Sequence, residues 1–224
     1  MEEGAAREGL SSEGIAAQLR VRILEGAYSL GQRLIEMDLA EEFGVGRGRV
    51  REAFRMLTGE GYLEFVANRG VLVRCYTRAE LIEMGRVREV LEGLAAKLAA
   101  EAELSGEMRQ ELEALQERMN VAEAAGDYPS FGAENRAYHA LIERLAGNKF
   151  ASAYIDRVRI PLIRVQMPPA DVAESIGRSN RDHRVITAAI LNGAPEAAEA
   201  AMRAHVRAGN EHVARLPEAV FSAS

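Results

Sequence analysis

The sequence predicts a mainly α-helical protein in two parts: an N-terminal domain of three helices and a β-hairpin, then an all-α antiparallel bundle of six or seven helices. Two observations predict this class. Hydrophobic residues make up 48% of the chain, but aromatic residues are only 5% and tryptophan is missing, which favours helices over a large β-sandwich. The spacing of apolar residues is helical up to Gly61, alternates after it, and is helical again from residue 78 onwards.

Composition also excludes several classes of protein. A chain of 224 residues with 28% charged residues can bury a core, so it is not wholly disordered. The single cysteine, Cys75, excludes an intrachain disulfide framework and a cysteine-based zinc finger. No stretch approaches the ~18 uncharged apolar residues of a membrane span, and the acidic opening is unlike a secretory signal. We therefore expect a soluble, cytoplasmic protein with no membrane partner.

The N-terminal domain is expected over residues 12–75, after a flexible tail at residues 1–11. Its helices begin at capping residues and end at glycines, and its hairpin follows from the alternating pattern. The expected elements are a helix from Ser12 to near Gly26, a helix at about 36–43, the turn Gly44-Val45-Gly46, a helix ending near Thr58, and a β-hairpin that turns at Asn68-Arg69-Gly70.

The helical bundle is expected over residues 78–216, followed by a tail at residues 217–224. Glycine and proline separate its helices, as in Asn192-Gly193-Ala194-Pro195, where a C-cap glycine precedes a proline at a helix start. Antiparallel helices of this length pack as a bundle. They are expected at about 78–103, 106–125, 128–146, 148–165, 171–191 and 195–215.

The third helix carries a concentration of positive charge. The net charge of −6 argues against a general polyanion binder, but the segment Gly44–Arg55 has four arginines against the single acid Glu52. Arginine is also the basic residue best suited to bidentate contacts with phosphate or guanine. Arg47, Arg51 and Arg55 are four residues apart, so they lie on one face of the helix. The alternative interpretation is a solvated charged face, which is what charge runs usually mean.

A helix, a short glycine turn, a second helix and a two-stranded hairpin follow one another in the order of a winged helix-turn-helix. In that fold the second helix enters the major groove of double-stranded DNA. We expect Arg47 and Arg51 to reach bases or nearby phosphates, and Arg49 and Arg55 to contact mainly phosphates. The pair Arg69-Gly70, at the hairpin tip, is placed like a wing that enters the minor groove.

Four segments of this domain carry a more specific signal. They are Leu30-Gly31-Gln32-Arg33-Leu34-Ile35-Glu36, Leu39-Ala40-Glu41-Glu42-Phe43-Gly44-Val45, Val50-Arg51-Glu52-Ala53-Phe54-Arg55-Met56-Leu57 and Glu60-Gly61-Tyr62-Leu63. Together they resemble the N-terminal domain of the GntR family of bacterial transcription regulators. The resemblance implies a regulator, expected to be a repressor, that binds operator DNA as a homodimer with half-sites related by two-fold symmetry.

The chain departs from the family pattern at three positions. Leu30 stands where the family often has proline, and Gly46 and Gly48 replace the Ser or Thr and the Pro that often flank the arginine equivalent to Arg47. These departures remove hydroxyl contacts to phosphate but leave the arginines in place. The two glycines also allow the backbone to approach DNA closely.

Three histidines and one asparagine form a second candidate site. Asn135 and His139 are four residues apart on one helix and point to the same side. His183 and His205 lie on the last two helices beside apolar residues, so both can face the interior of the bundle. Three neutral imidazoles and one oxygen satisfy a divalent metal such as zinc, nickel or manganese. The alternative is three histidines with separate structural roles, and the spacing leaves both open.

A second resemblance bears on this choice. It is carried by Arg88-Glu89-Val90-Leu91-Glu92, Asn135-Arg136-Ala137-Tyr138-His139 with Ala146-Gly147-Asn148, Asp182-His183-Arg184-Val185-Ile186 with Ala188-Ala189-Ile190, and Met202-Arg203-Ala204-His205. These segments resemble the C-terminal FCD domain of the FadR subfamily. In its metal-binding members an Asp or Asn and three His ligate one divalent ion, and small carboxylates bind beside it.

The resemblance implies the ligand set Asn135, His139, His183 and His205 and one divalent ion per chain, with zinc as the first candidate and nickel or manganese as alternatives. His212 has no counterpart and is interpreted as structural. Because asparagine replaces the more common aspartate, the site keeps a charge of +2 and attracts an anionic effector more strongly.

Arg88 is the candidate for the effector's carboxylate, which a guanidinium group can bind with two parallel hydrogen bonds. The alternative is an ordinary ion pair with Glu92, four residues further along the same helix.

The sequence thus predicts a DNA-binding transcription regulator, not an enzyme, that responds to a small organic acid at a metal-containing cavity. Two alternatives remain. A metal-dependent hydrolase would also use three histidines, although the chain has no H-E-x-x-H motif and no carboxylate clearly placed as a general base. In the other, the protein binds DNA and the metal is purely structural.

Overall fold

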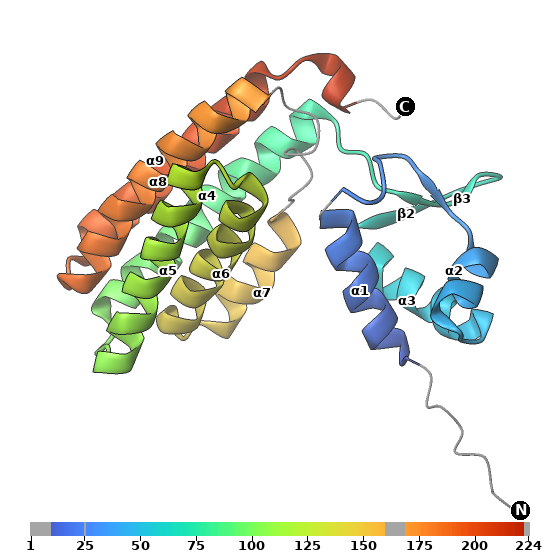
Figure 1. Ribbon diagram of the computed structural model, residues 1–224, viewed down its shortest axis with the longest axis horizontal. Helices are drawn as coiled ribbons and strands as arrows, with labels where there is room; N and C mark the ends of the chain where they lie inside the picture. The colour runs from blue at the N-terminus through green and yellow to red at the C-terminus, as the bar shows by residue number, and fades with distance from the viewer. Residues whose placement is uncertain (1–9, 25, 160–168, 222–224) are drawn as a thin grey trace, which may run out of the picture. The chain divides into compact units, whose positions relative to one another are not determined.

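The computed structural model describes residues 10–24, 26–159 and 169–221 of the chain. It divides into two compact units (Figure 1). One unit comprises the described residues of Met1–Thr77 and of Glu218–Ser224, and the other those of Arg78–Pro217. The predicted class is confirmed: the chain is mainly helical, with one small sheet in the N-terminal unit.

The N-terminal unit packs three helices against a three-stranded antiparallel sheet. Its elements are α1 (Ser12–Leu24), β1 (Arg33–Leu34), α2 (Glu36–Phe43), α3 (Arg47–Gly59), β2 (Leu63–Val66) and β3 (Gly70–Val73). The strand order is β1-β3-β2, and Leu63 pairs with Val73. Apolar residues at helical spacing on α1 and α3 are fully buried against one another, among them Ile15, Leu19, Ile23, Val50 and Leu57.

The turn between α2 and α3 ends the first of these helices sharply. Gly44 has the left-handed φ of 64°, which glycine adopts without strain. This conformation lets the Gly44 and Val45 N–H groups bond back to the carbonyls of Glu41 and Ala40, so the end of α2 is capped. The chain then enters α3 two residues later, and the relative direction of the two helices follows from this turn.

The sheet has one strand more than the predicted hairpin. Strand β1 was not predicted, because a strand of two residues has no measurable period. In the hairpin, Phe65 of β2 pairs with Val71 of β3 and is 73% exposed.

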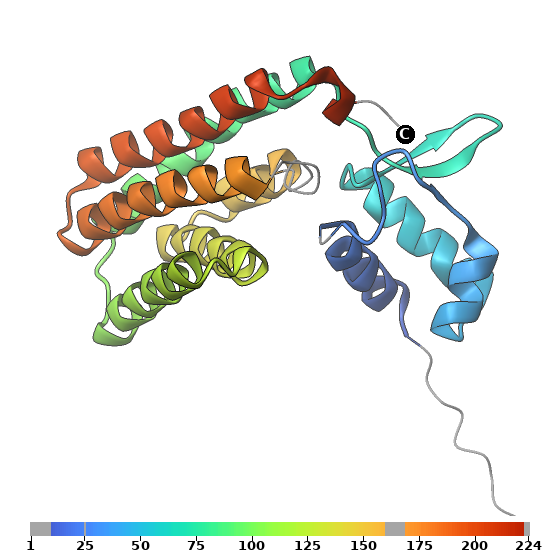
Figure 2. The same ribbon diagram turned by 45° about the horizontal axis from the view of Figure 1, so that its top comes forward.

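The second unit is a bundle of six helices within the described residues. They are α4 (Arg78–Glu101), α5 (Gly106–Ala125), α6 (Tyr128–Ala146), α7 (Lys149–Val158), α8 (Pro169–Leu191) and α9 (Pro195–Arg215). Figure 2 shows α4 and α9 running alongside each other, with α8 next to α9 and α5 next to α6. The core between them is formed by Leu112, Met119, Phe131, Tyr138, Leu141, Ile142, Ile155, Ile186, Ile190, Met202 and Val206.

Two glycines allow α4 and α9 to approach each other closely. A Cβ atom at Gly85 would collide with the side chain of Asn210, and one at Gly93 would collide with that of Arg203. Each glycine therefore forms a notch on α4 that receives a side chain of α9. This contact sets the position of α9, the helix that carries His205.

The helix boundaries lie close to those predicted, with two differences. Helix α7 ends at Val158, and the part of its predicted range beyond Arg159 lies outside the described residues. The segment predicted as a C-terminal tail contains a 3-10 helix, Glu218–Phe221, and Phe221 is buried. No helix in the described ranges is long and apolar enough to span a membrane.

Polar caps fix the starts of the site-bearing helices. The side chain of Asp127 accepts a hydrogen bond from Ser130 N–H at the start of α6, at 3.0 Å. Asn148 Oδ1 accepts from Ala151 N–H at the start of α7, at 3.1 Å. Such caps satisfy N–H groups that have no partner within the helix.

The substitution Asn148→Ala removes the cap of α7, and we expect it to lower the free energy of unfolding by about 1 kcal/mol. Urea unfolding followed by circular dichroism measures this change. Asn148→Ser is the matched control, because it keeps an oxygen acceptor and should retain most of the stability. Equal midpoints for wild type and Asn148→Ala would contradict the capping role.

Candidate functional site

The exposed face of α3 carries the predicted arginines. Arg47, Arg49, Arg51 and Arg55 are all exposed, whereas Val50, Phe54 and Leu57 on the opposite side are buried. The helix thus has an apolar back fixed in the core and a basic front facing solvent. This is the arrangement that a helix entering the major groove requires.

Two carboxylates lie among these arginines. The Glu36 carboxylate, at the start of α2, accepts hydrogen bonds from Arg51 Nε at 3.1 Å and Arg51 Nη2 at 2.9 Å. Glu52 accepts one hydrogen bond, from Arg55 Nη1 at 3.0 Å. The Arg51 hydrogen bonds lower the pKa of Glu36 most, with smaller contributions from the charges of Arg51, Arg47 and Arg55. Three arginines therefore surround one acid.

The start of α3 is open on its outer side. Gly46 is in extended conformation, with φ −71° and ψ 144°, and no side chain of the described chain caps the first turn. A Cβ atom added to Gly46 or Gly48 would meet no atom within 4 Å. The N–H groups at the start of a helix and the positive end of the helix dipole suit an anion such as phosphate.

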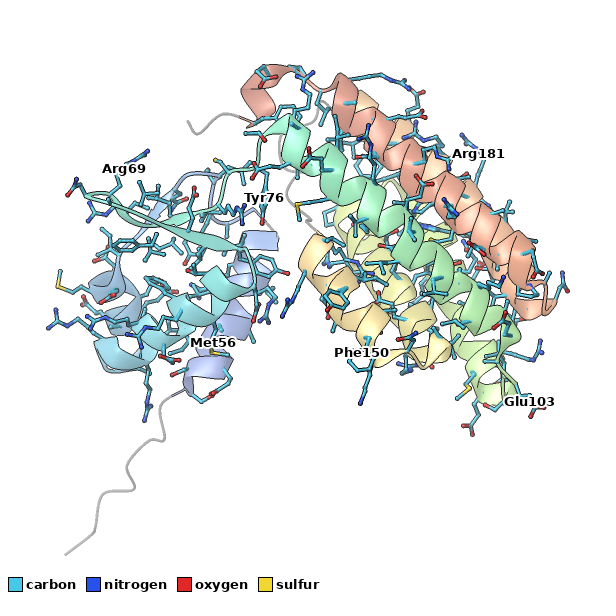
Figure 3. All side chains as sticks on the ribbon, turned by 180° about the vertical axis from the view of Figure 1, so that it is seen from behind. Met56, Arg69, Tyr76, Glu103, Phe150 and Arg181 are labelled. Atoms are coloured by element: carbon cyan, nitrogen blue, oxygen red, sulfur yellow. The ribbon has the colours of Figure 1, made fainter. Side chains whose placement is uncertain are left out.

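The hairpin presents the predicted wing. Asn68 and Gly70 have positive φ angles of 64° and 85°, which make the tight turn between β2 and β3. Arg69 lies between them and is exposed. Figure 3 shows its side chain at the end of the hairpin, pointing away from the sheet.

The bundle brings three of the four histidines together. His139 lies on α6, His183 on α8 and His205 on α9, and one potential ligand atom of each lies within 4.8 Å of the other two. The ring centroids are 4.5 to 5.5 Å apart. These distances allow the three imidazoles to share one ion. His212 is not part of the cluster.

Two carboxylates lie behind the histidines. Glu92 Oε2 on α4 is 2.8 Å from His139 Nδ1, and Asp182 Oδ2 is 3.4 Å from His205 Nδ1. A carboxylate at Nδ1 favours a proton there and a lone pair on Nε2. Burial lowers the pKa of His139 to about 4, although Glu92 opposes this shift. His139 is therefore neutral near pH 7 and able to ligate a metal.

Asn135 lies on the same helix as His139, one turn earlier. Its Oδ1 atom is buried and has no hydrogen-bond partner among the described residues. A buried carbonyl oxygen without a partner is unusual and marks a position where an ion or ligand group fits. The chemistry of the donor set, one amide oxygen and three imidazoles, therefore fits a divalent ion.

Arg88 forms the ion pair with Glu92 that was considered as the alternative to effector binding. Its Nε atom lies 2.8 Å from Glu92 Oε1, the residue four positions further along α4. Burial raises the pKa of Glu92, but Arg88, His139 and Arg159 together outweigh burial and hold the pKa well below its usual range. In this structure the charge of Arg88 compensates a buried carboxylate.

Arg159 and Glu143 were not predicted as part of the site. Arg159, just after α7, forms an ion pair with Glu143 on α6, and its Nη2 lies 3.6 Å from Glu92 Oε1. The carboxylates of Glu92 and Glu143 are both buried. Two guanidinium groups and two carboxylates thus form an ionic cluster next to His139. Only the apolar setting of Glu92 in its helix could have indicated it from the sequence.

A buried polar network holds the backbone of α8 at His183. The Tyr138 hydroxyl donates to the carbonyl of His183 at 3.1 Å and lies 2.9 Å from Thr187 Oγ1. Thr187 donates to Gln116 Oε1, and Gln116 Nε2 donates to Asn180 Oδ1 at 2.8 Å. These bonds join α5, α6 and α8, so the backbone at His183 has a fixed position.

Comparison with known proteins agrees with both halves of this description. Residues 11–73 match the model for bacterial regulatory proteins of the gntR family, and residues 83–208 match the FCD domain model. The chain belongs to the GntR family. The family assignment predicted from the sequence motifs is therefore confirmed, together with the FCD domain.

Individual GntR-family proteins resemble the chain over most of its length. A "probable D-xylose utilization operon transcriptional repressor" of Paenarthrobacter nicotinovorans is 33% identical over 216 residues, 91% of each chain. The gluconate operon transcriptional repressor of Bacillus licheniformis is 29% identical over 136 residues, 61% of this chain and 55% of that protein. The solved structure of McbR/YncC of E. coli has the same fold, with a TM-score of 0.77 at 24% identity, covering 90% of this chain and 96% of that one.

The Glu36–Arg51 pair predicts a pH dependence. Since the folded-state pKa of Glu36 is lowered, the stabilisation is present above the ordinary value of 4.5 and is lost as the pH falls through the folded-state pKa. We expect Arg51→Ala to return the pKa of Glu36 toward 4.5, as measured by carboxyl-carbon NMR titration. Arg55→Ala is the control and should change that pKa less, because Arg55 does not hydrogen bond to Glu36. An unchanged Glu36 pKa in Arg51→Ala would contradict the pair.

Proposed function

We propose that the protein is a transcription regulator that binds operator DNA as a homodimer and changes its operator affinity when a small carboxylate binds at a divalent metal in the bundle. Membership of the GntR family carries the regulatory part of this proposal. The convergence of three imidazoles from three helices carries the sensing part.

The N-terminal unit supplies the DNA-binding surface of the proposal. Arg47 and Arg51 project from the first half of α3 toward bases or nearby phosphates, and Arg49 and Arg55 contact phosphates. Arg69-Gly70 enters the minor groove. The open space around Gly46 and Gly48 supports a close backbone approach, because the fold itself does not require glycine there.

Asn135, His139, His183 and His205 would hold one divalent ion, zinc in the first instance and nickel or manganese as alternatives. When bound, the ion supplies a concentrated positive charge that attracts carboxylate groups. Glu92 and Asp182 keep two of the imidazoles oriented toward it. Because all four proposed ligands are neutral, no ligand atom carries a charge that compensates the ion, which favours an anionic effector.

A small hydroxycarboxylate is the effector class that we propose. The name of one relative refers to a gluconate operon, and gluconate combines a carboxylate with several hydroxyl groups. Such a molecule would place its carboxylate at the ion. Arg88 remains a candidate partner for the same carboxylate, provided that it releases Glu92.

The signal would reach the DNA-binding unit through α4. This helix carries Glu92, which contacts His139, and it begins at Arg78, directly after the N-terminal unit. The Arg78 guanidinium donates to the carbonyls of Ala214 at 3.1 Å and Leu216 at 2.7 Å, at the end of α9. A movement of α9 on effector binding would therefore be transmitted to the start of α4.

A homodimer is supported by an apolar stripe on the outer face of α4. Val87, Val90 and Leu94 follow each other at helical spacing and are all exposed in the single chain. Contiguous exposed apolar side chains are typical of protein interfaces. A dimer in which two copies bury this stripe against each other would also have two α3 helices, one for each half-site of an operator.

A hydrolytic enzyme is less well supported by the same geometry. Among the described carboxylates near the histidines, Glu92 and Asp182 contact imidazoles and Glu143 pairs with Arg159. Glu134 pairs with Arg118 at 2.8 Å. A general base needs a carboxylate free to take a proton from water. These pairings therefore favour regulation over hydrolysis.

The metal proposal predicts that a variant lacking one of the histidines binds less zinc. His183→Ala removes one of the three imidazoles, so the affinity for zinc in equilibrium dialysis over a series of free zinc concentrations should fall at least about tenfold. Metal analysis of the dialysed protein measures this. His212→Ala is the matched control, outside the cluster, and should retain zinc. Full occupancy in a folded His183→Ala protein would remove His183 from the ligand set.

The effector proposal predicts a change in operator affinity. Operator sequences are first selected with the full chain from randomised duplexes, and then titrated with protein in the presence of gluconate or other small carboxylic acids. At saturating effector the dissociation constant should change by about 5- to 150-fold for the zinc-loaded protein, the usual range of such coupling, and not for His183→Ala.

The alternatives give different results in the same assays. A purely structural metal would leave operator affinity unchanged with every acid, while chelation would unfold the bundle. An enzyme would turn over ester or amide substrates when loaded with metal, and chelation would stop the turnover.

A further inference from the structure

The contact between Glu36 and Arg51 has a geometry that bears on how DNA sequence is read. Glu36 is the first residue of α2, and Arg51 is on the exposed face of α3. Glu36 Oε1 accepts from Nε and Oε2 accepts from Nη2, at 3.1 and 2.9 Å, so the carboxylate lies against the side of the guanidinium plane. Two parallel bonds fix both the position and the plane of the group.

This arrangement leaves the outer edge of the Arg51 guanidinium available. A guanidinium has five N–H donors, and the side-on pair uses one on Nε and one on Nη2. The remaining three lie on Nη1 and Nη2, and two of them are parallel at the end of the side chain. That end-on pair matches the O6 and N7 acceptors of guanine in the major groove.

The second arginine–glutamate contact on α3 lacks this geometry. Arg55 donates one hydrogen bond to Glu52, three residues earlier on the same exposed helix face. One bond between two exposed side chains does not fix the guanidinium plane. Arg55 therefore remains free to follow a phosphate, whereas Arg51 is presented in one orientation.

A carboxylate near DNA also has an unfavourable effect, because the phosphates repel it. The side chain of Glu36 is about one third exposed, at 30%, and lies on the same surface as Arg47, Arg51 and Arg55. For binding to phosphate alone its negative charge would be a disadvantage. An acid at this position is useful when orientation of the arginine matters more than total positive charge.

We propose that Glu36 is a positioning residue that holds the Arg51 guanidinium side-on, so that its end-on edge reads one guanine in each operator half-site. The inference rests on the proposed DNA-binding function. It assigns sequence discrimination to a pair of residues, one on α2 and one on α3, instead of to the recognition helix alone.

The test uses the full chain and randomised duplexes. Wild type should select guanine at one position in each half-site. Replacing that guanine with 7-deazaguanine, which lacks the N7 acceptor, should weaken binding about fivefold or more. In Glu36→Gln the preference for guanine at this position should fall about three- to tenfold, because a neutral amide cannot make the charge-assisted bidentate bond.

The matched control is Glu52→Gln, which makes the same change of charge on the same surface. It should keep the guanine preference. Both variants should bind an unrelated duplex as tightly as wild type or more tightly, because each loses a negative charge. Arg51→Ala should abolish the preference, and adding Glu36→Gln to it should cause no further loss.

Three results with the variants would overturn the inference. A full guanine preference in Glu36→Gln would remove the positioning role. If Glu36→Gln binds all duplexes more weakly by the same factor and also has a lower melting temperature, Glu36 is a structural residue only. If Arg51→Ala keeps the guanine preference and binds every duplex more weakly by the same factor, Arg51 contacts phosphate and not a base. If wild type selects no duplex at all, the DNA-binding function itself fails, and the inference with it.

Discussion

The buried carboxylate of Glu92 is the interaction on which the helical unit depends. It is 2% exposed and lies 2.8 Å from both Arg88 Nε and His139 Nδ1. An unpaired charge in such a position would be destabilising by several kcal/mol. The groups that stabilise this carboxylate are Arg88 on α4, His139 on α6 and Arg159 just after α7. Arg159 also pairs with Glu143. These helices must therefore pack together for any one of the charges to be tolerated, and the orientation of His139 follows from that packing.

The same kind of contact recurs at the other candidate site residues. Glu92 stands behind His139, Asp182 behind His205 and Glu36 behind Arg51. In each pair an acid contacts one side of a nitrogen-bearing group and leaves the other side for a ligand. Orientation of the group is then determined before the ligand arrives, which reduces the entropy lost on binding.

The sequence predicted most of the fold because its signals are local. Glycines such as Gly44, Gly126 and Gly147 end helices with positive φ, and the apolar spacing defines each helix between them. It also placed Asn135 and His139 on one side of one helix. The expectation that His139 lies close to His183 and His205 came from the family resemblance, since spacing along separate helices does not fix their mutual distance.

What the sequence did not predict depends on long-range contacts. Arg159 meets Glu92 across 67 positions of the chain, and no local pattern indicates that pairing. Gln116 and Asn180 look like surface residues of amphipathic helices, yet they bond to each other in the core. The Arg51 side chain was recognised as basic and exposed, but its bond to Glu36 depends on how the turn at Gly44 directs α2 toward α3.

The two notches of α4 limit how the bundle can respond to a ligand. The side chains of Asn210 and Arg203 occupy the space that Gly85 and Gly93 leave open, eight residues apart on α4 and seven apart on α9. If α9 slid along its neighbour, both side chains would leave their recesses and meet larger residues. These two contacts therefore oppose sliding of α9 along α4, and a conformational change of the bundle that keeps both contacts would have to move the two helices together.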